Sequence, residues 1–387
     1  MSHRSAHTNQ YLLEGVAILS LILLIIALGV LHVTRPPEKF ASQNATQENT
    51  VQAKVLAVGD ETVSEMPTGE QLYSRDIEVQ ILSEGPFEGQ TMTLNQRRME
   101  QTSSITPRAG QRVLIILAQQ PDGQVVPFLA DRVRLTPLAL LAALFVAVTL
   151  GVGRGQGLRA LLGLLLSLAA IGGFILPQLL AGRAPLLVTF VGMGALMAVT
   201  LYLIQGWNIR THTAFLALLG CLSVTALLAL LWVEVSALTG FGSEETLYLQ
   251  ATGVTLDMRG LLLAGIVIGA SGVLDDVVLA QAVSVYEIAE ANPALTVREI
   301  FRRGMKIGNA HLASMVNTLV LAYASTALPL IILFALYTEP WYLTLNREFI
   351  AEEVVRTLVG SLGLLLAVPL TTAIAAWMAP QMGEAAR

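Results

Sequence analysis

The chain has 387 residues, of which 54% are hydrophobic and only 13% are charged, and its formal net charge at pH 7 is −5. Soluble domains carry about 25% charged residues, so this composition and several long apolar runs exclude an ordinary soluble protein and indicate a polytopic membrane protein. No basic stripe or base-stacking motif supports binding to nucleic acid.

The first predicted element is a membrane anchor over residues 1–34, in which 11–33 is almost entirely Leu, Ile and Ala. A cleaved signal peptide is the alternative, but the run is long for one and lacks a clear small-residue cleavage site. An uncleaved transmembrane helix is therefore favoured. Residues 35–50, with two prolines followed by a polar stretch, are expected to be a linker.

Residues 51–134 differ in composition and are predicted to form a small all-β domain. Strand-like runs recur at 51–58, 72–82, 91–94, 112–118 and 125–133, with turn residues between them. About five short strands in so short a segment suggest a barrel of the OB or SH3-like type. Without an aromatic platform or a metal cluster, this domain is expected to bind a protein or cell-envelope partner rather than to do chemistry.

Residues 135–387 are predicted to form a seven-helix membrane domain. Apolar runs lie at about 135–152, 158–181, 184–204, 213–237, 259–284, 307–337 and 354–379, and each approaches or exceeds the ~17–25 residues that cross a bilayer. With the anchor, the expected fold is a polytopic α-helical membrane protein of about eight transmembrane helices, with the β-domain inserted after the first.

The basic residues of the short loops predict the orientation of these helices. Seven fall on one side of the membrane and four on the other, and the richer side is expected to be cytoplasmic. Both termini are then cytoplasmic, and the β-domain is extracytoplasmic. The richer set is Arg154, Arg159, Arg210, Arg298, Arg302, Arg303 and Lys306, and the other is Arg183, Arg259, Arg347 and Arg356.

Two adjacent carboxylates, Asp275 and Asp276, interrupt the apolar run at 259–284. A charge at the bilayer centre costs about 2.5 kcal/mol or more, so such residues usually face a bundle interior or a water-filled cavity. Neighbouring carboxylates repel each other, and removal from water favours their protonated forms, so the pair is expected to titrate as one coupled unit. This pattern predicts a proton or ion relay, with a hydrogen-bonded structural pair as the alternative.

The next apolar run offers polar side chains at a similar depth if the two helices are antiparallel. A polar seam supporting the aspartates is therefore predicted, formed by Ser271, Asn309, His311, Ser314 and Asn317. Small residues on the first helix are predicted to let the two helices approach closely, and they are Gly265, Gly269 and Gly272. A proton-shuttle role for His311 and a structural role at the membrane interface both stay open.

The connection between these two helices has its own pattern. Thr296 and Glu299 fit a capping box, and apolar residues then alternate with basic ones. A short amphipathic helix near 296–306 is therefore predicted on the cytoplasmic membrane surface, with a solvated turn as the alternative. Elsewhere the glycine-rich segment 151–157 lacks a preceding strand and a phosphate-binding lysine, so a tight turn is expected there. No catalytic residue, metal site or cofactor is expected, and the chain is not expected to be an enzyme.

Residues 258–330 resemble the signature of the YibE/F family of bacterial membrane proteins. The similar phrases are MRGLLLAGIVIGASGVLDDV, VYEI, REIFRRGMKIG and MVNTLVLAYASTALPL. The resemblance implies a multi-pass protein of the bacterial plasma membrane, and it assigns no biochemical activity. Asp275 matches the acidic position of the family, whereas Asp276 stands where an apolar residue is more usual. The region is also similar, more distantly, to the proton-relay helices of RND exporters and Sec accessory proteins.

Two classes of function follow from the sequence. In the first, the chain is a proton- or ion-coupled transporter or export factor in which Asp275 titrates and Asp276 tunes it. In the second, it is a non-transporting membrane scaffold or assembly protein whose β-domain binds a partner. Loss of proton-coupled flux in a folded Asp275→Asn variant would distinguish the first from the second. The sequence indicates a lipid bilayer as the environment and gives no oligomeric state.

Overall fold

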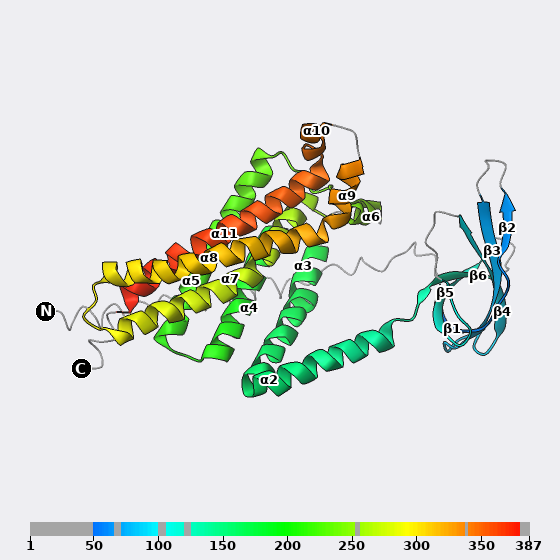
Figure 1. Ribbon diagram of the computed structural model, residues 1–387, viewed down its shortest axis with the longest axis horizontal. Helices are drawn as coiled ribbons and strands as arrows, with labels where there is room; N and C mark the ends of the chain where they lie inside the picture. Colours follow the sequence, from blue (N-terminus) through cyan, green and yellow to red (C-terminus); the bar gives the residue numbers. More distant parts are fainter. Residues whose placement is uncertain are drawn as a thin grey trace. The chain divides into compact units, whose positions relative to one another are not determined.

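The structure is a computed structural model of the chain, and it describes residues 49–65, 71–99, 106–119, 125–251, 256–336 and 340–379. It divides into two compact units (Figure 1), of which one is Glu38–Val152 and the other combines Met1–Pro37 with Gly153–Arg387. The predicted anchor at 1–34 and nearly all of the predicted linker at 35–50 lie outside the described residues.

An antiparallel β-sheet dominates the first unit, which confirms a separate β-domain. Its described strands are β1 (Asn49–Val58), β2 (Thr62–Glu65), β3 (Gln71–Ile81), β4 (Thr91–Met99), β5 (Arg112–Gln119) and β6 (Val125–Arg132). The hydrogen-bonded order is β2-β3-β1-β5-β6, and β4 pairs with the other edge of β3. Alternate side chains of β1, β3 and β5 point into one apolar core, as the two-residue period of a strand requires.

Five of these strands coincide with the predicted ones, to within a few residues at most ends. Strand β2 was not predicted, because all four of its side chains are exposed and no alternation of polar and apolar residues marks it. Strand β4 runs to Met99, beyond the predicted end at residue 94, since its second half pairs with the start of β3.

A long helical stretch follows the β-domain. It consists of α2 (Leu135–Ala170), a π-helical segment at Ile171–Ile175, and α3 (Leu176–Leu180). Arg154 interrupts α2 with a non-helical backbone, at φ 48° and ψ −125°. This residue lies inside the glycine-rich segment for which the sequence predicts a turn, so the break is present as a kink within α2.

The second unit is a helical bundle. Its described helices after α3 are α4 (Pro185–Gln205), α5 (Ile209–Val235), α6 (Glu244–Ala251), α7 (Met258–Ala291), α8 (Val297–Thr326), α9 (Leu328–Leu336), α10 (Trp341–Leu345) and α11 (Glu348–Met378). Helix α11 packs against α5, α7 and α8, and α4 packs against α5 and α7 (Figure 1). Small and branched apolar side chains of these helices form the core between them.

In the described part of the chain, five helical segments are long and apolar enough to cross a membrane. They are Leu135–Leu180, Pro185–Gln205, Ile209–Val235, Met258–Ala291 and Glu348–Met378. The predicted runs at 135–152 and 158–181 both fall within the first of these. The predicted run at 307–337 is divided between α8 and α9, and neither is among the five.

Helix α8 joins two elements that the sequence analysis treats separately. The basic segment at 296–306 and the apolar segment after it form one continuous helix, Val297–Thr326. The capping box at its start is confirmed, because the Thr296 side chain accepts a bond from the Glu299 N–H and the Glu299 carboxylate accepts one from the Thr296 N–H. The basic residues therefore occupy the first turns of a long helix rather than a separate short one.

Candidate functional site

The two predicted carboxylates lie in the middle of a bundle helix. Asp275 and Asp276 occupy the central part of α7, which is 34 residues long and begins at an N-cap formed by Asp257. The other charged residues of α4, α5, α7 and α11 lie nearer the helix ends. They are Arg210, Glu234, Arg259, Glu287, Glu290, Glu348, Glu352, Glu353 and Arg356. In these four helices, the aspartates are therefore the charged residues whose position cannot be explained by contact with water at a helix end.

The two aspartates have different surroundings. The Asp276 side chain is exposed, whereas Asp275 is half-buried. One carboxylate oxygen of Asp275 is fully buried and has no hydrogen-bond donor among the described residues. The predicted supporting residue Ser271 is also buried, but its hydroxyl donates to the Ile268 carbonyl of its own helix at 2.7 Å. A buried oxygen without a hydrogen-bond partner costs about 1–3 kcal/mol, so the position of Asp275 lowers the stability of the fold.

A stripe of small residues runs along the exposed face of α7 on both sides of Asp276. Gly265, Gly269, Gly272, Asp276 and Ala280 are all exposed and recur every three or four residues, which places them on one face of the helix. A Cβ at Gly265 or Gly272 would meet no described atom within 4 Å, whereas one at Gly269 would lie 3.0 Å from the Tyr323 hydroxyl of α8. Most of this stripe is thus open, and Asp276 stands in its centre.

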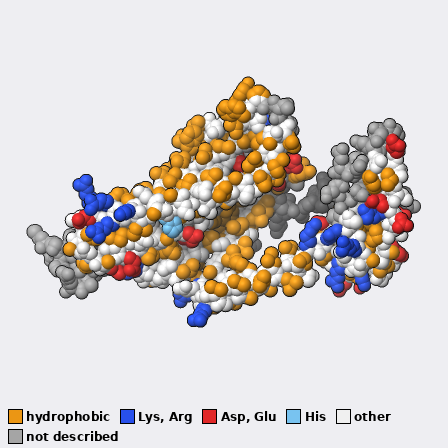
Figure 2. Space-filling view, viewed as in Figure 1, with side chains coloured by type: hydrophobic (Ala, Val, Ile, Leu, Met, Phe, Trp, Pro, Cys, Tyr) orange, Lys and Arg blue, Asp and Glu red, His pale blue; other side chains and the backbone are white. Residues whose placement is uncertain are grey.

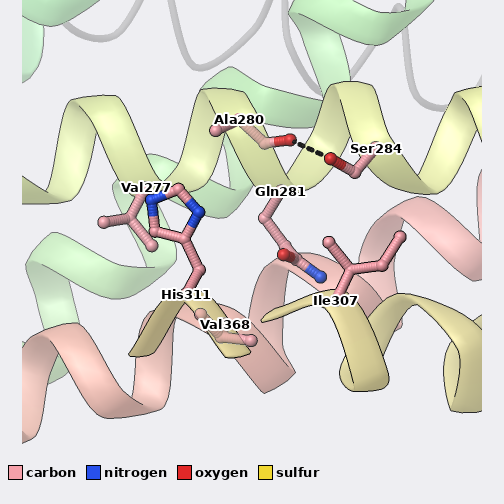
Figure 3. A pocket seen from close by; sticks show the side chains of 7 residues that line it. All are labelled: Val277, Ala280, Gln281, Ser284, Ile307, His311 and Val368. Atoms are coloured by element: carbon pink, nitrogen blue, oxygen red, sulfur yellow. Dashed lines mark hydrogen bonds between the residues drawn. The ribbon is translucent and has the colours of Figure 1, made fainter. Parts of the chain in front are cut away.

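Helix α8 faces this stripe with His311. The side chain lines a small recess of about 20 Å³ (Figure 3), whose lining residues are Val277, Ala280, Gln281, Ser284, Ile307, His311 and Val368. Asp276 is not one of the lining residues, but it directly precedes Val277 and lies one helical turn before Ala280. Figure 2 shows a histidine beside an acidic side chain on the surface that α7 and α8 share, among mostly apolar and uncharged groups. His311 therefore lines the recess itself, and Asp276 is next in sequence to one of its lining residues.

The other predicted members of the seam lie on different sides of α8. Ser314 is exposed and, three residues after His311, lies on the same side of the helix. Asn309 and Asn317 are also exposed, but the period of 3.6 residues turns them away from the side that His311 occupies. Of the predicted seam residues on α8, His311 is the one that lines the recess beside α7, and the seam itself stays a prediction.

One buried polar contact was missed by the sequence analysis. Gln281 of α7 is only 5% exposed, and its side-chain amide donates to the Gly304 carbonyl of α8 at 3.0 Å and to the Thr372 hydroxyl of α11 at 2.8 Å. A Cβ at Gly304 would lie 2.8 Å from the Thr372 methyl group, so glycine is needed for the close approach of these helices. The sequence does contain a signal of this contact. Gly304 and Gly308 lie four residues apart on one helix, and Gln281 is a lone glutamine in the apolar run of the other.

Polar contacts also fasten the two ends of the bundle. At one end, Arg210 of α5 forms ion pairs with Glu287, at 3.1 Å, and with Glu290 of α7. At the other, the Glu348 carboxylate of α11 accepts bonds from the backbone N–H groups of Thr239 and Gly240. These contacts join the helices at both ends of the bundle, and the open stripe around Asp276 lies between them.

A family model described as YibE/F-like protein matches residues 141–381. The match includes both aspartates, the facing half of α8 and the Gln281 contact. Neither a curated protein nor a solved structure matches the chain significantly.

Proposed function

The chain belongs to the YibE/F-like family of membrane proteins, and on this premise we propose that it is a proton-coupled transporter or export factor whose relay is the Asp275–Asp276 pair. The observation that carries the proposal is the position of Asp276, which stands mid-helix in α7, exposed on an open stripe and next in sequence to Val277, which lines a recess together with His311. An ionisable residue at membrane depth that faces a cavity is the usual mark of an ion or proton pathway.

The recess gives the relay a chemical route. Its polar lining comes from Gln281, Ser284 and His311, which together offer donors and acceptors to entering water. In the proposed relay, a proton passes between the imidazole of His311 on α8 and the carboxylate of Asp276 on α7. One oxygen of Asp275 is buried and lacks a described hydrogen-bond donor. Once Asp275 accepts the proton from Asp276, its carboxyl group can donate a hydrogen bond, which the ionised carboxylate cannot do.

Proton binding would change what the α7 stripe can contact. An ionised Asp276 requires water or a partner, whereas a neutral one can lie against lipid or against another helix. The small residues on either side leave room for such an approach. The coupling we propose is therefore a movement between α7 and α8 that follows protonation of the aspartates.

The finer topology belongs to the same proposal. Two crossings by the kinked α2–α3 stretch, one by α8 with α9, and one by the segment before the β-domain would bring the total to eight. The β-domain would then be an OB or SH3-like barrel outside the cytoplasm, with both termini inside. The curl of the sheet, in which β4 comes near β6, supports a barrel-like domain.

The test is proton flux in proteoliposomes that enclose a pH-sensitive dye. We expect the wild-type protein to carry protons down an imposed gradient, and Asp275→Asn and Asp276→Asn to lose this flux while folding normally. Asp276→Glu keeps a carboxylate on the stripe and should retain part of the flux. Glu287→Gln removes an exposed carboxylate from the end of the same helix, where Glu290 still pairs with Arg210, and should leave the flux unchanged.

The opposite result would support the scaffold function. In that case neither the wild type nor any variant carries protons above the level of empty liposomes, and the asparagine substitutions change only thermal stability or capture of a partner. Infrared spectra give a second readout that does not depend on flux. A carboxyl signal that follows pH in the wild type and is altered in Asp276→Asn is expected for a relay.

A further inference from the structure

The β-domain carries a group of basic side chains that the proposed relay does not use. We call this group the basic edge, and it consists of the exposed residues Lys54, Arg108, Arg112, Arg132 and Arg134. Figure 2 shows Lys and Arg side chains gathered on the part of the β-domain next to the beginning of α2. The β-domain and the first part of α2 belong to the same compact unit.

Strand pairing explains why these residues meet although they are distant in sequence. Lys54 of β1 lies directly opposite Arg112, the first residue of β5. The chain leaving β6 passes the same point, because the Val133 N–H donates to the Arg112 carbonyl at 3.2 Å. The Arg132 guanidinium donates to the Thr106 carbonyl, which ties the segment before β5 to this edge.

Most of the positive charge on the basic edge is not neutralised within the protein. Arg134 forms an ion pair with Asp131 at 2.6 Å, and the bond from the Arg134 side chain, followed by the Arg132 N–H, lowers the pKa of Asp131. Asp131 therefore stays ionised and offsets one cation. No ion pair reaches Lys54, Arg108 or Arg112 from any described residue.

The basic edge also lies next to the start of a candidate membrane span. Arg134 is followed at once by Leu135, the first residue of α2 and of a candidate membrane span. The large apolar side chains of this part of α2 are exposed, as expected for contact with lipid, and they include Leu135, Leu138, Leu140, Leu141 and Leu144. If α2 enters a bilayer at Leu135, Arg134 and the basic edge beside it lie near the lipid headgroups.

From this placement we infer that the basic edge binds anionic phospholipid headgroups and holds the β-domain against the surface of the bilayer that α2 enters. Each Lys or Arg near an anionic surface shifts such an equilibrium by about fivefold. The attraction falls off within a Debye length of about 8 Å at physiological salt, so it acts only on residues close to the surface. Removal of two cations should therefore weaken docking by about 25-fold.

The test uses the full chain in nanodiscs and measures energy transfer from a dye on the β-domain to labelled headgroups. Thr93 of β4 is exposed and can be replaced by cysteine for labelling, while Cys221 is buried and stays unlabelled. We expect stronger transfer in discs that contain phosphatidylglycerol than in discs of phosphatidylcholine alone. High salt should remove the difference.

Two double variants locate the effect. Lys54→Gln with Arg112→Gln should abolish the extra transfer, whereas Arg75→Gln with Arg97→Gln, which removes two cations from β3 and β4, should preserve it. Equal transfer by the wild type in both kinds of disc would overturn the inference, and so would an equal loss in both double variants. The comparison of lipids and salts in the wild type decides the matter even if a variant folds poorly.

Discussion

The contact made by Gln281 allows a quantitative test of the bundle. Its amide joins α7 to both α8 and α11, and replacement by methionine keeps the length of the side chain while removing two interhelical hydrogen bonds. Such bonds contribute on average about 0.6 kcal/mol each in membrane proteins, with a maximum near 1.7 kcal/mol. The Thr372 hydroxyl keeps its bond to the Val368 carbonyl at 2.6 Å. Gln281→Met should therefore lower the free energy of unfolding by about 1–3 kcal/mol.

A double-mutant cycle isolates one of the two bonds. Gln281→Met and Thr372→Val should show a coupling of about 0.6–1.7 kcal/mol when unfolding of the detergent-solubilised protein is followed by denaturant titration. The neighbouring buried residue Thr371 supplies the control, because Thr371→Val should add to Gln281→Met without coupling. If the Thr372 cycle is also additive, the Gln281–Thr372 bond does not join α7 to α11 and the reasoning fails.

Three further changes probe other parts of the bundle. Gly308→Ala should destabilise the protein by about 1–3 kcal/mol in thermal unfolding, because its Cβ would overlap neighbouring side chains, whereas Gly272→Ala, into open space, should change stability by less than about 1 kcal/mol. Glu352→Ala removes a buried acceptor of the Gly242 N–H at 3.0 Å, so proteolysis near Gly242 should be faster and stability lower by about 1.5–3 kcal/mol. Hydrogen bonds from the backbone and side chain of Thr296 lower the pKa of Glu299. The wild type should therefore be more stable than Glu299→Gln above the ordinary glutamate pKa, and this difference in stability should vanish as the pH falls through the lowered pKa. Melting curves at neutral and acid pH would measure it.

The sequence predicted the elements whose pattern comes from burial. Strands β1, β3 and β5 alternate because one side of each meets the core, and the long helices are apolar because of their environment. The fully exposed β2 escaped prediction for the same reason. The Thr296 capping box was recognisable because it depends on residues only three positions apart.

Contacts between distant segments could not be predicted in the same way. The aspartates were visible because charge is rare in an apolar helix, but which side of α8 faces them depends on the rotation of that helix. That rotation brings His311 to the recess beside α7, and the helical period puts Asn309 and Asn317 on other sides of α8. Glycine is equally ambiguous in sequence, because it marks tight packing at Gly308 and open space at Gly272.

The contrast between Gln281 and the aspartates bears directly on function. All three are polar residues in one apolar helix, yet Gln281 is fully engaged with two neighbouring helices and so stabilises the bundle. The aspartates make no described side-chain bond that would tie α7 to α8, although a charge in this position costs about 2.5 kcal/mol or more. Because Gln281 already provides the tie between these helices, structural need does not account for the carboxylates. The proposed relay would account for them, since it requires a carboxylate that no permanent partner occupies.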